Sequence, residues 1–317
     1  MINPTTTVRG FAAGDEGPLV AAWNRGMPAD PTTSGRLRDC VLLDPNFDPE
    51  GLRVAVIGGE FAGCAYGVRR LVPLAPSTDL EPGTGWIPFF FVAPEHRGRG
   101  LGRRLVEEAL AFLARHGRTT VEFAPYTPNY VLPGVDAALY PDAYRLLERL
   151  GFRTLYTPVA MDRTLVGYTV PDEVRELRAA REREGYAFRA PADGELPELI
   201  RFAAGVFNPD WGEAIRRMGD LGRLIVAVRE RIVGFAAYGA YRGIPERFGP
   251  FGVDPAERGT GLGKILLHAA MTGMRAEGLH GSWFLWTGET GPAGNLYTRA
   301  GYEVTRRFHV MRLVQPR

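Results

Sequence analysis

The chain has few cysteines, almost no net charge and no long apolar run, and each of these absences excludes a class of protein. Two cysteines among 317 residues, Cys40 and Cys64, are too few for a disulfide framework or a zinc cluster built on cysteines. The 38 basic and 36 acidic side chains leave a formal net charge of +2, so no basic field favours nucleic acid. No apolar run approaches the roughly 20 residues that span a bilayer, and we expect no membrane partner.

The opening stretch and the histidines exclude two further features. The opening MINPTTTVRGFAAGDE contains no apolar core of the kind that a signal peptide has. The five histidines are scattered along the chain without the spacing of metal ligands, so we expect no metal site. These observations favour a soluble, cytoplasmic protein, a monomer or a homodimer.

Glycine, in contrast, is abundant at 40 residues, and its placement draws attention to an internal repeat. Three features that occur twice in the same order are a β-hairpin, a glycine- and arginine-rich turn before an amphipathic helix, and a helix ended by glycine before a strand. They span Leu52 to Gly67 and Leu224 to Gly239, Val92 to Leu110 and Val253 to Met271, and Ala143 to Tyr156 and Ala293 to Arg306. A strand, an acidic turn and a helix also open each half. A repeat of this length indicates a duplicated domain.

The repeat predicts two domains, residues 1–165 and 166–317, with a charged surface helix over residues 171–185 linking the halves. Each half predicts a strand, a helix, a β-hairpin, a strand, the glycine-rich turn, a helix, a strand, a helix and a strand. This order is typical of a mixed α/β sheet with helices on its faces. Gly151 and Gly301 stand where the last helix of each half needs a residue of positive φ to end it.

Each glycine-rich turn follows a buried strand and opens a helix. In the first half, WIPFFFVA predicts a strand buried on both faces, and Leu101, Leu105 and Ala109 follow helical spacing. A helix N-terminus offers unpaired backbone N–H groups and the positive end of the helix dipole. Glycine lets the backbone approach an anion closely, and arginine adds bidentate donors. The pattern therefore predicts a site for a pyrophosphate group.

Two common phosphate motifs do not fit these turns. The P-loop pattern fails because Gly263 and Lys264 are followed by Ile265, and the dinucleotide pattern G-x-G-x-x-G fails on the glycine spacing. What fits twice is Arg-x-x-Gly-x-Gly after a strand and Val-x-Pro, with Arg97 and Arg258 as the first residues. This pattern resembles the acetyl-CoA signature of the GNAT N-acetyltransferase superfamily. The resemblance covers most of the chain, as two tandem copies.

The resemblance implies a fold, a cofactor and a reaction. Each half is then a mixed, mostly antiparallel sheet, splayed at a groove for acetyl-CoA and flanked by helices. The turn amides hold the pyrophosphate, the end of the preceding strand pairs with the pantetheine arm, and an acceptor amine attacks the acetyl carbonyl directly. The residues implied for cofactor binding are Phe91, Val92, Arg97, Gly98, Arg99, Gly100, Leu101, Gly102, Arg103, Gly252, Val253, Arg258, Gly259, Thr260, Gly261, Leu262, Gly263, Lys264 and Asn295.

The family often supplies the proton for the departing thiolate from a tyrosine four residues before the glycine that ends the last helix. Tyr297 holds that position in the second half, whereas Leu147 holds it in the first. Tyr144 lies one helical turn from this position, and Tyr140 is farther away. We therefore expect the C-terminal half to be catalytic, with Tyr297 as general acid. The N-terminal half is expected to bind acetyl-CoA, to help shape the acceptor site or to be a remnant.

The candidates for a general base and for the acceptor site are less specific. Glu246 is the first candidate for a base, with Glu122 and Glu289 as alternatives, and a solvated loop position for Glu246 stays open. Asn129 is a candidate to hydrogen-bond the pantetheine or an acceptor, or an ordinary turn residue. We expect a small-molecule amine acceptor; an aminoglycoside-like antibiotic and a protein N-terminus or lysine remain open. The alternative to an enzyme is a non-catalytic acyl-CoA-binding or sensing protein of the same fold.

Overall fold

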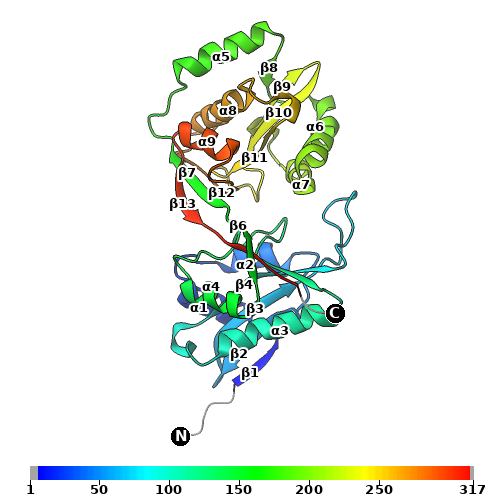
Figure 1. Cartoon of the computed structure of the whole chain (residues 1–317), viewed down its shortest axis with the longest axis vertical. Helices are drawn as coiled ribbons and strands as arrows, with labels where there is room; N and C mark the ends of the chain where they lie inside the picture. The colour runs from blue at the N-terminus through cyan, green and yellow to red at the C-terminus, as the bar shows by residue number, and fades with distance from the viewer. Residues whose placement is uncertain (1–5, 315–317) are drawn as a thin grey trace. The chain divides into compact units, whose positions relative to one another are not determined.

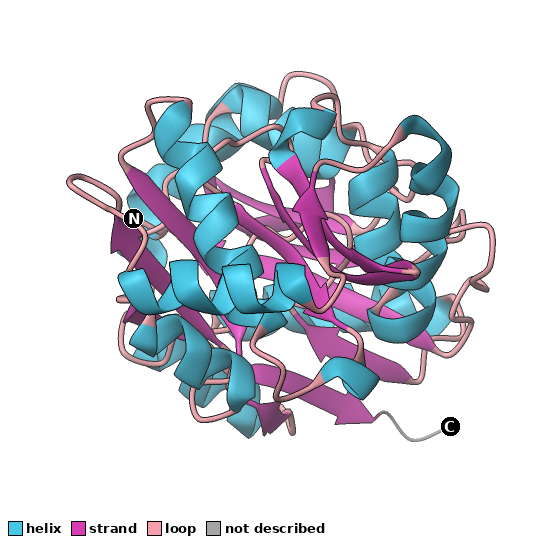
Figure 2. Ribbon diagram, turned by 90° about the horizontal axis from the view of Figure 1, so that it is seen from above, coloured by secondary structure: helices cyan, strands magenta, loops and turns pink. Residues whose placement is uncertain are grey.

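A computed structural model describes residues 6–314, which fold into two compact units. Unit 1 takes in the described residues up to Leu74, Thr78–Thr157 and the described residues from Arg307 onward. Unit 2 takes in Ala75–Ser77 and Pro158–Arg306. Both units combine helices with strands (Figure 1, Figure 2), so the predicted α/β class is confirmed.

Unit 1 follows the predicted order of elements, with one additional short helix and a last strand that comes from the end of the chain. Its helices are α1 (Glu16–Gly26), α2 (Ser34–Leu37), α3 (Leu101–Arg115) and α4 (Pro141–Arg149). Its strands are β1 (Thr6–Gly10), β2 (Leu52–Ile57), β3 (Glu60–Val68), β4 (Thr84–Val92), β5 (Thr120–Phe123), β6 (Arg153–Tyr156) and β14 (Val310–Val314).

Unit 2 repeats this order after the linking helix α5, which the sequence predicts. Its helices are α5 (Asp172–Arg183), α6 (Leu196–Phe202), α7 (Pro209–Arg216), α8 (Leu262–Ala276) and α9 (Pro292–Arg299). Its strands are β7 (Val159–Thr164), β8 (Ala187–Arg189), β9 (Leu224–Arg229), β10 (Arg231–Tyr238), β11 (Phe248–Val253), β12 (Gly281–Thr287) and β13 (Glu303–Arg307).

The sheet of unit 1 opens along one side of β4. Its strand order is β1-β2-β3-β4-β5-β14-β6, and the pair β4–β5 is parallel while the other pairs of neighbours with a described register are antiparallel. The β4–β5 pairing ends at Ile87 opposite Phe123, and from there to Val92 β4 is paired only with β3, on its other edge. The free edge of β4 beyond Ile87 is the splay that the family resemblance implies.

In unit 2 the same opening separates two sheets. One sheet has the order β11-β10-β9-β8 and the other β12-β7-β13. Their facing strands, β11 and β12, meet at an isolated parallel bridge between Arg247 and Trp283. At this point the Trp283 amide donates a hydrogen bond to the Glu246 carbonyl at 3.0 Å. Beyond the bridge the two strands diverge, so both units have a splayed sheet.

Two strands join a sheet other than the one their position in the repeat predicts. β7 pairs antiparallel with β12 in unit 2, from Thr164 opposite Gly281 onward. β14 pairs with β5 in unit 1, where Met311 lies opposite Phe123. The compact units therefore differ from the predicted division at residues 75–77, 158–165 and 307–314. A sequence repeat predicts the order of the elements, but it does not predict which sheet a given strand joins.

Long helices fix the two turns in place by packing along the sheets. In unit 1, α3 lies along β2, β3 and β4 (Figure 1). Its Leu105 and Phe112 are almost completely buried. In unit 2, α8 lies along β9, β10 and β11 and buries Leu266 and Met271. Full burial of such side chains stabilises the fold by about 1.5–3 kcal/mol each. The N-terminus of each helix is consequently held at the end of a central strand.

Candidate active site

The two glycine-rich turns have the same backbone conformation. In unit 1, Gly98 and Gly100 have φ angles of 73° and 77°, and Gly100 caps α3. In unit 2, Gly259 and Gly261 have φ angles of 84° and 86°, and Gly261 caps α8. Residues other than glycine rarely adopt this left-handed backbone conformation. In both units, the backbone conformation of the turn thus explains why glycine recurs at this spacing.

A cavity of about 560 Å³ adjoins the turn of unit 1. Its walls come from the end of α1, the free part of β4, the turn with the start of α3, and α4. Members of the expected cofactor set that line it are Phe91, Val92, Arg97, Gly98, Gly100, Leu101, Gly102 and Arg103. A Cβ atom built on Gly98 or Gly100 would meet no heavy atom within 4 Å. Open space therefore borders the bare backbone of the turn.

Arg97 has a different orientation from the one that its motif position suggests. Its Nε donates a hydrogen bond to the Val92 carbonyl at 3.0 Å, and its Nη2 donates to the Gly26 carbonyl at 2.7 Å. The guanidinium group therefore connects the turn to the end of β4 and to the end of α1. These two hydrogen bonds stabilise the turn, whereas the motif position of Arg97 predicts that its donors face a phosphate. Arg99 is exposed on the same turn.

In unit 2 the linking helix α5 covers one side of the turn. A Cβ atom built on Gly261 would lie 2.7 Å from a methyl group of Leu177. Lys264, in the first turn of α8, forms an ion pair with Glu173 at 3.2 Å. The sequence predicts α5 as a surface linker, but its contact with Gly261 makes it part of the surroundings of the turn.

A phenylalanine ring lies beside the end of the central strand in both units, but it comes from different elements. Phe91 on β4 and Gly252 on β11 hold equivalent places, one residue before the valine that ends each strand. A Cβ atom on Gly26 would lie 2.8 Å from the Phe91 ring. A Cβ atom on Gly252 would lie 2.5 Å from the Phe207 ring. In unit 1 the phenylalanine is on the central strand and the glycine is on a helix, whereas in unit 2 the glycine is on the strand and the phenylalanine comes from the preceding helical region. Sequence reasoning missed this exchange because Phe207 is far from Gly252 along the chain.

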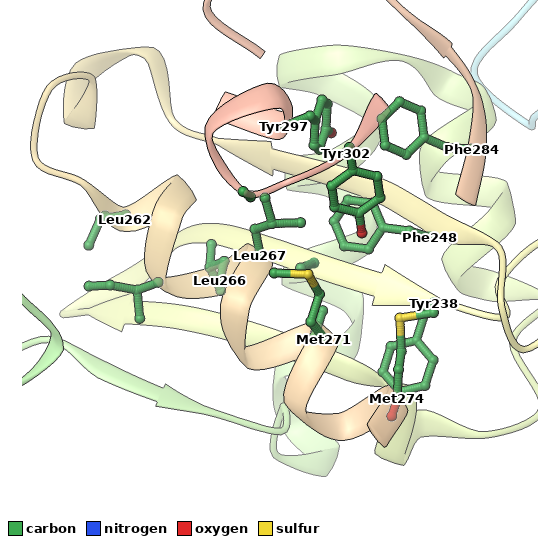
Figure 3. Packing of buried hydrophobic residues seen from close by; sticks show 14 of the residues in the cluster. Tyr238, Phe248, Leu262, Leu266, Leu267, Met271, Met274, Phe284, Tyr297 and Tyr302 are labelled. Carbon is green, nitrogen blue, oxygen red and sulfur yellow. The ribbon is translucent and has the colours of Figure 1, made fainter. Parts of the chain in front are cut away.

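Tyr297 lies between the diverging strands of unit 2 (Figure 3). Its ring centroid is 6.1 Å from that of Phe248 on β11 and 4.4 Å from that of Phe284 on β12. The side chain is 7% exposed. Burial, with a smaller contribution from Tyr302, raises the pKa of the Tyr297 hydroxyl well above its ordinary value. Tyr297 therefore keeps its proton at neutral pH and above.

The corresponding part of unit 1 has no tyrosine at this position. Leu147 is completely buried in the core of unit 1. The ring of Tyr144 packs on His309, with 4.7 Å between ring centroids. Tyr140 lines the cavity, and its hydroxyl donates a hydrogen bond to a carboxylate oxygen of Asp30 at 2.6 Å. From its position in the sequence, Tyr140 is only a distant substitute for a tyrosine at Leu147.

The candidate bases lie in different surroundings. Glu246 is half-buried at the point where β11 and β12 separate, and its carbonyl accepts the Trp283 amide. Glu122 on β5 forms an ion pair with Arg312 on the neighbouring strand β14. Glu289 lies in the loop between β12 and α9. Glu246 is therefore the candidate base that stands where the two strands of unit 2 separate.

The two asparagines of the sequence analysis differ in accessibility. Asn129 is 9% exposed, and its amide donates to the Asp44 carboxylate at 2.5 Å within a buried polar cluster of unit 1. It therefore serves the interior of the fold. Asn295 is exposed on α9, and its amide donates to the Thr290 carbonyl at 3.4 Å.

Across residues 6–314, no group of three or more histidine, cysteine, aspartate or glutamate side chains is arranged to hold a metal ion. None of the helices in the described part of the chain is long and apolar enough to cross a membrane. Cys40 and Cys64 are both buried.

Comparison with known families assigns the class that the turns and the splayed sheets indicate. The acetyltransferase (GNAT) family matches residues 20–152, and the acetyltransferase (GNAT) domain matches residues 220–304. The chain belongs to the GNAT acetyltransferase family and carries two copies of its domain. It is an N-acetyltransferase, and its cofactor is acetyl-CoA.

The similar proteins include mycothiol acetyltransferases and a tandem GNAT protein. The mycothiol acetyltransferase of Nocardia farcinica is 30% identical over 256 residues, which cover 72% of this chain and 76% of that protein. A tandem GNAT protein from the clavulanic acid biosynthesis pathway has a TM-score of 0.64 at 17% identity, and the match covers 99% of this chain and 100% of that chain.

A third similar protein is a region of a larger fungal enzyme. The GCN5-related glucosamine N-acetyltransferase region of a fungal multi-domain GH3 beta-N-acetylglucosaminidase has a TM-score of 0.81 at 20% identity. The match covers 99% of this chain and 38% of that chain. At this level of identity, both structural matches show the shared fold.

The turn and cavity of unit 1 are compatible with acetyl-CoA. The bare glycine backbone allows close approach of a pyrophosphate, and the positive end of α3 faces it. The free edge of β4 up to Val92 can pair with an extended amide chain, as another strand would. A cavity of about 560 Å³ is within the usual range for cofactor sites.

Proposed function

We propose that the chain transfers an acetyl group from acetyl-CoA to the amine of a small molecule, with the chemistry in unit 2. The observation that carries the proposal is the position of Tyr297 between β11 and β12, where the sheets separate. When bound, acetyl-CoA supplies the activated acetyl group. The residues of the chain hold the phosphates, orient the thioester and supply a proton to the departing sulfur.

In this proposal the turn of unit 2 binds the cofactor and Tyr297 acts as the general acid. The amides from Arg258 to Lys264 hold the pyrophosphate, and the end of β11 at Gly252 and Val253 pairs with the pantetheine. Asn295 on α9 contributes a hydrogen bond from the other side of the groove. Because burial raises the pKa of Tyr297, its hydroxyl is available as a proton donor.

Glu246 is the proposed base for the acceptor amine. Its backbone marks the point where β11 and β12 part, two residues before Phe248, whose ring contacts Tyr297. A carboxylate at this place can take a proton from the incoming amine directly or through one water. This role is supported by position alone.

In unit 1 the proposed cofactor site runs from Phe91 to Arg103. Leu147 cannot donate a proton, so the proton-transfer chemistry of unit 2 is not repeated there. Two roles follow for unit 1: it holds acetyl-CoA without transfer, or it recognises an acceptor with other residues.

The acceptor proposal is supported by the names of similar proteins. Relatives from several bacteria are named mycothiol acetyltransferase. We therefore propose a small-molecule amine, with an acceptor related to mycothiol as the first to test. Specificity is expected to come from the loops before β4 and β11, because such loops are carried by a rigid scaffold and vary freely.

The proposal is tested with Tyr297→Phe and a matched control, Tyr302→Phe. Tyr302 lies in the same aromatic cluster, with its hydroxyl 2.6 Å from that of Ser282 (Figure 3). Loss of a general acid lowers turnover by about a hundredfold or more. We expect that loss for Tyr297→Phe, with unchanged acetyl-CoA affinity by calorimetry, and near-normal turnover for Tyr302→Phe. Equal turnover of wild type and Tyr297→Phe across pH would remove Tyr297 from the mechanism.

A further inference from the structure

The cavity of unit 1 joins the glycine-rich turn to the place where β4 and β5 separate. On the side of the turn it is lined by Gly98, Gly100 and Arg103. On the side of the strands it is lined by Phe90 on β4 and Phe123 on β5, whose ring centroids are 5.8 Å apart. A ligand whose phosphates lie at the turn, and whose amide chain pairs with the free edge of β4, therefore places its acyl group where the strands separate.

The walls of this cavity away from the turn are apolar and come from several elements. Met27 follows α1, Phe89 lies on β4, and Leu132 and Val135 lie in the segment between β5 and α4. All four side chains are 8% exposed or less. Apolar walls favour an apolar ligand group, because binding removes both surfaces from water.

The charged side chains of the cavity lie in other parts of its wall. Arg97 and Arg103 belong to the turn and the start of α3, and Asp142 and Arg149 belong to α4. Asp142 forms an ion pair with Arg145 at 2.6 Å. Among the described residues of the lining, no charged side chain comes from β4, β5 or the segment between β5 and α4. The cavity thus combines a basic region for phosphates with an apolar region.

The segment that forms the apolar wall is held by backbone contacts. The Val135 amide donates to the His309 carbonyl at 3.0 Å, and the His309 amide donates to the Val135 carbonyl at 2.8 Å. A Cβ atom on Gly134 would lie 2.6 Å from the same His309 carbonyl oxygen. Tyr140 also lines the cavity, and its hydroxyl donates to Asp30 at 2.6 Å. The wall is therefore formed before any ligand binds, which lowers the entropic cost of recognition.

In unit 2 the ring of Tyr297 lies where the strands diverge. Its centroid is 4.4 Å from that of Phe284 on β12 (Figure 3) and 6.1 Å from that of Phe251 on β11. Phe251 stands two residues before the end of its strand, as Phe90 does on β4. In unit 1 the smaller Leu147 holds the position of Tyr297. We therefore expect less room for an acyl chain in unit 2.

We propose that the unit 1 cavity selects an acyl-CoA whose acyl chain is apolar and longer than acetyl. The inference rests on the proposed function, because it takes the turn from Gly98 to Arg103 as the site of the CoA phosphates. Acetyl-CoA binds the same site more weakly, since it leaves the apolar wall uncovered. The two units then differ in the acyl group that they prefer.

The test measures binding to the full chain by calorimetry with acetyl-CoA, butyryl-CoA and 3-hydroxybutyryl-CoA. The last two have acyl chains of the same length and differ by one hydroxyl group. Free CoA measures the contribution of the phosphates and the pantetheine alone. The unit 1 site is identified as the one that Gly100→Asp removes, because aspartate tolerates a positive φ and adds a negative charge at the pyrophosphate site.

We expect unit 1 to bind butyryl-CoA about tenfold more tightly than acetyl-CoA, because each buried methylene strengthens binding about fourfold. The hydroxyl of 3-hydroxybutyryl-CoA would lose water among apolar side chains, so this ligand should bind no more tightly than acetyl-CoA. In Gly100→Asp, where the unit 2 site remains, the preference for butyryl-CoA should be absent.

Two substitutions on different elements test the apolar wall itself. Met27→Gln and Leu132→Gln each keep a side chain of similar size and add an amide that loses water when the acyl chain binds. Both should remove the preference for butyryl-CoA while the affinity for free CoA is retained. Leu155→Gln is the matched control, because Leu155 is exposed on β6 and lies outside the lining of the cavity. This variant should keep the preference.

The outcomes separate this inference from the proposed function. If no acyl-CoA binds at the site that Gly100→Asp removes, the cofactor site proposed for unit 1 fails, and the inference fails with it. If that site binds acetyl-CoA as tightly as butyryl-CoA, the inference alone is overturned. The same holds if the preference survives in Gly100→Asp or in both glutamine variants of the wall.

Discussion

At the residue scale, His268 is a buried titratable group that the proposed chemistry does not use. It is 5% exposed on α8, and its Nδ1 lies 2.7 Å from the hydroxyl of Tyr168. Burial lowers its pKa to about 4, with Arg163 and Lys264 adding to the effect and Glu173 opposing it. In the folded chain His268 is therefore neutral at pH values where the unfolded chain, with a pKa near 6.5, binds a proton.

This difference in pKa predicts that unit 2 becomes less stable as the pH falls. The contribution of His268 to stability is fully present above pH 6.5 and is lost as the pH falls towards 4, by on the order of 3 kcal/mol. His268→Gln cannot titrate, so its free energy of unfolding should fall less between pH 7 and pH 4.5 than that of the wild type. Chemical denaturation at both pH values measures the difference. Parallel losses in the two proteins would contradict the assignment.

The candidate residues also show which features a sequence can predict. The position of Tyr297 follows from helical spacing relative to Gly301, which is local information. The bracing role of Arg97 depends on the carbonyl of Gly26, 71 positions away, and the pair of Tyr140 with Asp30 spans 110 positions. Motif spacing carries no signal for such contacts, because the partner lies in another element.

At the element scale, the main difference between the two copies is the helix packed beside the turn. Arg104 and Glu107 on α3 are exposed, as is Gly100, which precedes the helix. On α8, the matching residues Ile265 and His268 are buried, and Leu177 of α5 contacts Gly261. Ile265 is apolar where α3 has Arg104, as expected for a position on α8 that α5 covers. The sequence predicts α5 correctly as a helix, but the identity of the surface that it covers depends on the fold.

Alanine substitutions at the two capping glycines test this packing. Gly100→Ala and Gly261→Ala both place a Cβ at a positive φ, which costs about 1–2 kcal/mol. At Gly261 the added Cβ also lies 2.7 Å from Leu177, so we expect a further loss of about 1 kcal/mol or more. Chemical denaturation measures both variants.

A double-mutant cycle provides the control for the α5 contact. In a Leu177→Ala background, Gly261→Ala should cost about as much as Gly100→Ala, because the crowding methyl groups are gone. If Gly261→Ala costs the same with and without Leu177, the contact does not exist in solution.

At the scale of the whole molecule, the end of the chain completes unit 1. β14 lies between β5 and β6 in the sheet, and Val310 and Met311 are completely buried. The order of elements follows from periodicity in the sequence, but the partner of the last strand does not. A strand that follows β13 in the repeat is expected in the second half, whereas its hydrogen bonds are made in the first.

Shortening the chain tests this arrangement. A chain that ends at Arg306 lacks β14 and leaves the facing edges of β5 and β6 unpaired. Burial of Val310 and Met311 alone contributes about 3–6 kcal/mol, so we expect the thermal transition of unit 1 to be lost or strongly lowered. A chain that ends at Val314 is the control. Unchanged melting of unit 1 in the shorter chain would contradict the strand order.

Calorimetric titration of the full chain and of Gly100→Asp with acetyl-CoA is the most direct test of cofactor binding at the two turns. The two turns share their glycine backbone, and the proposed function places a cofactor at each. We predict two acetyl-CoA molecules per wild-type chain and one per Gly100→Asp chain. No binding to the wild type, or the same stoichiometry and affinities in both proteins, would contradict the account.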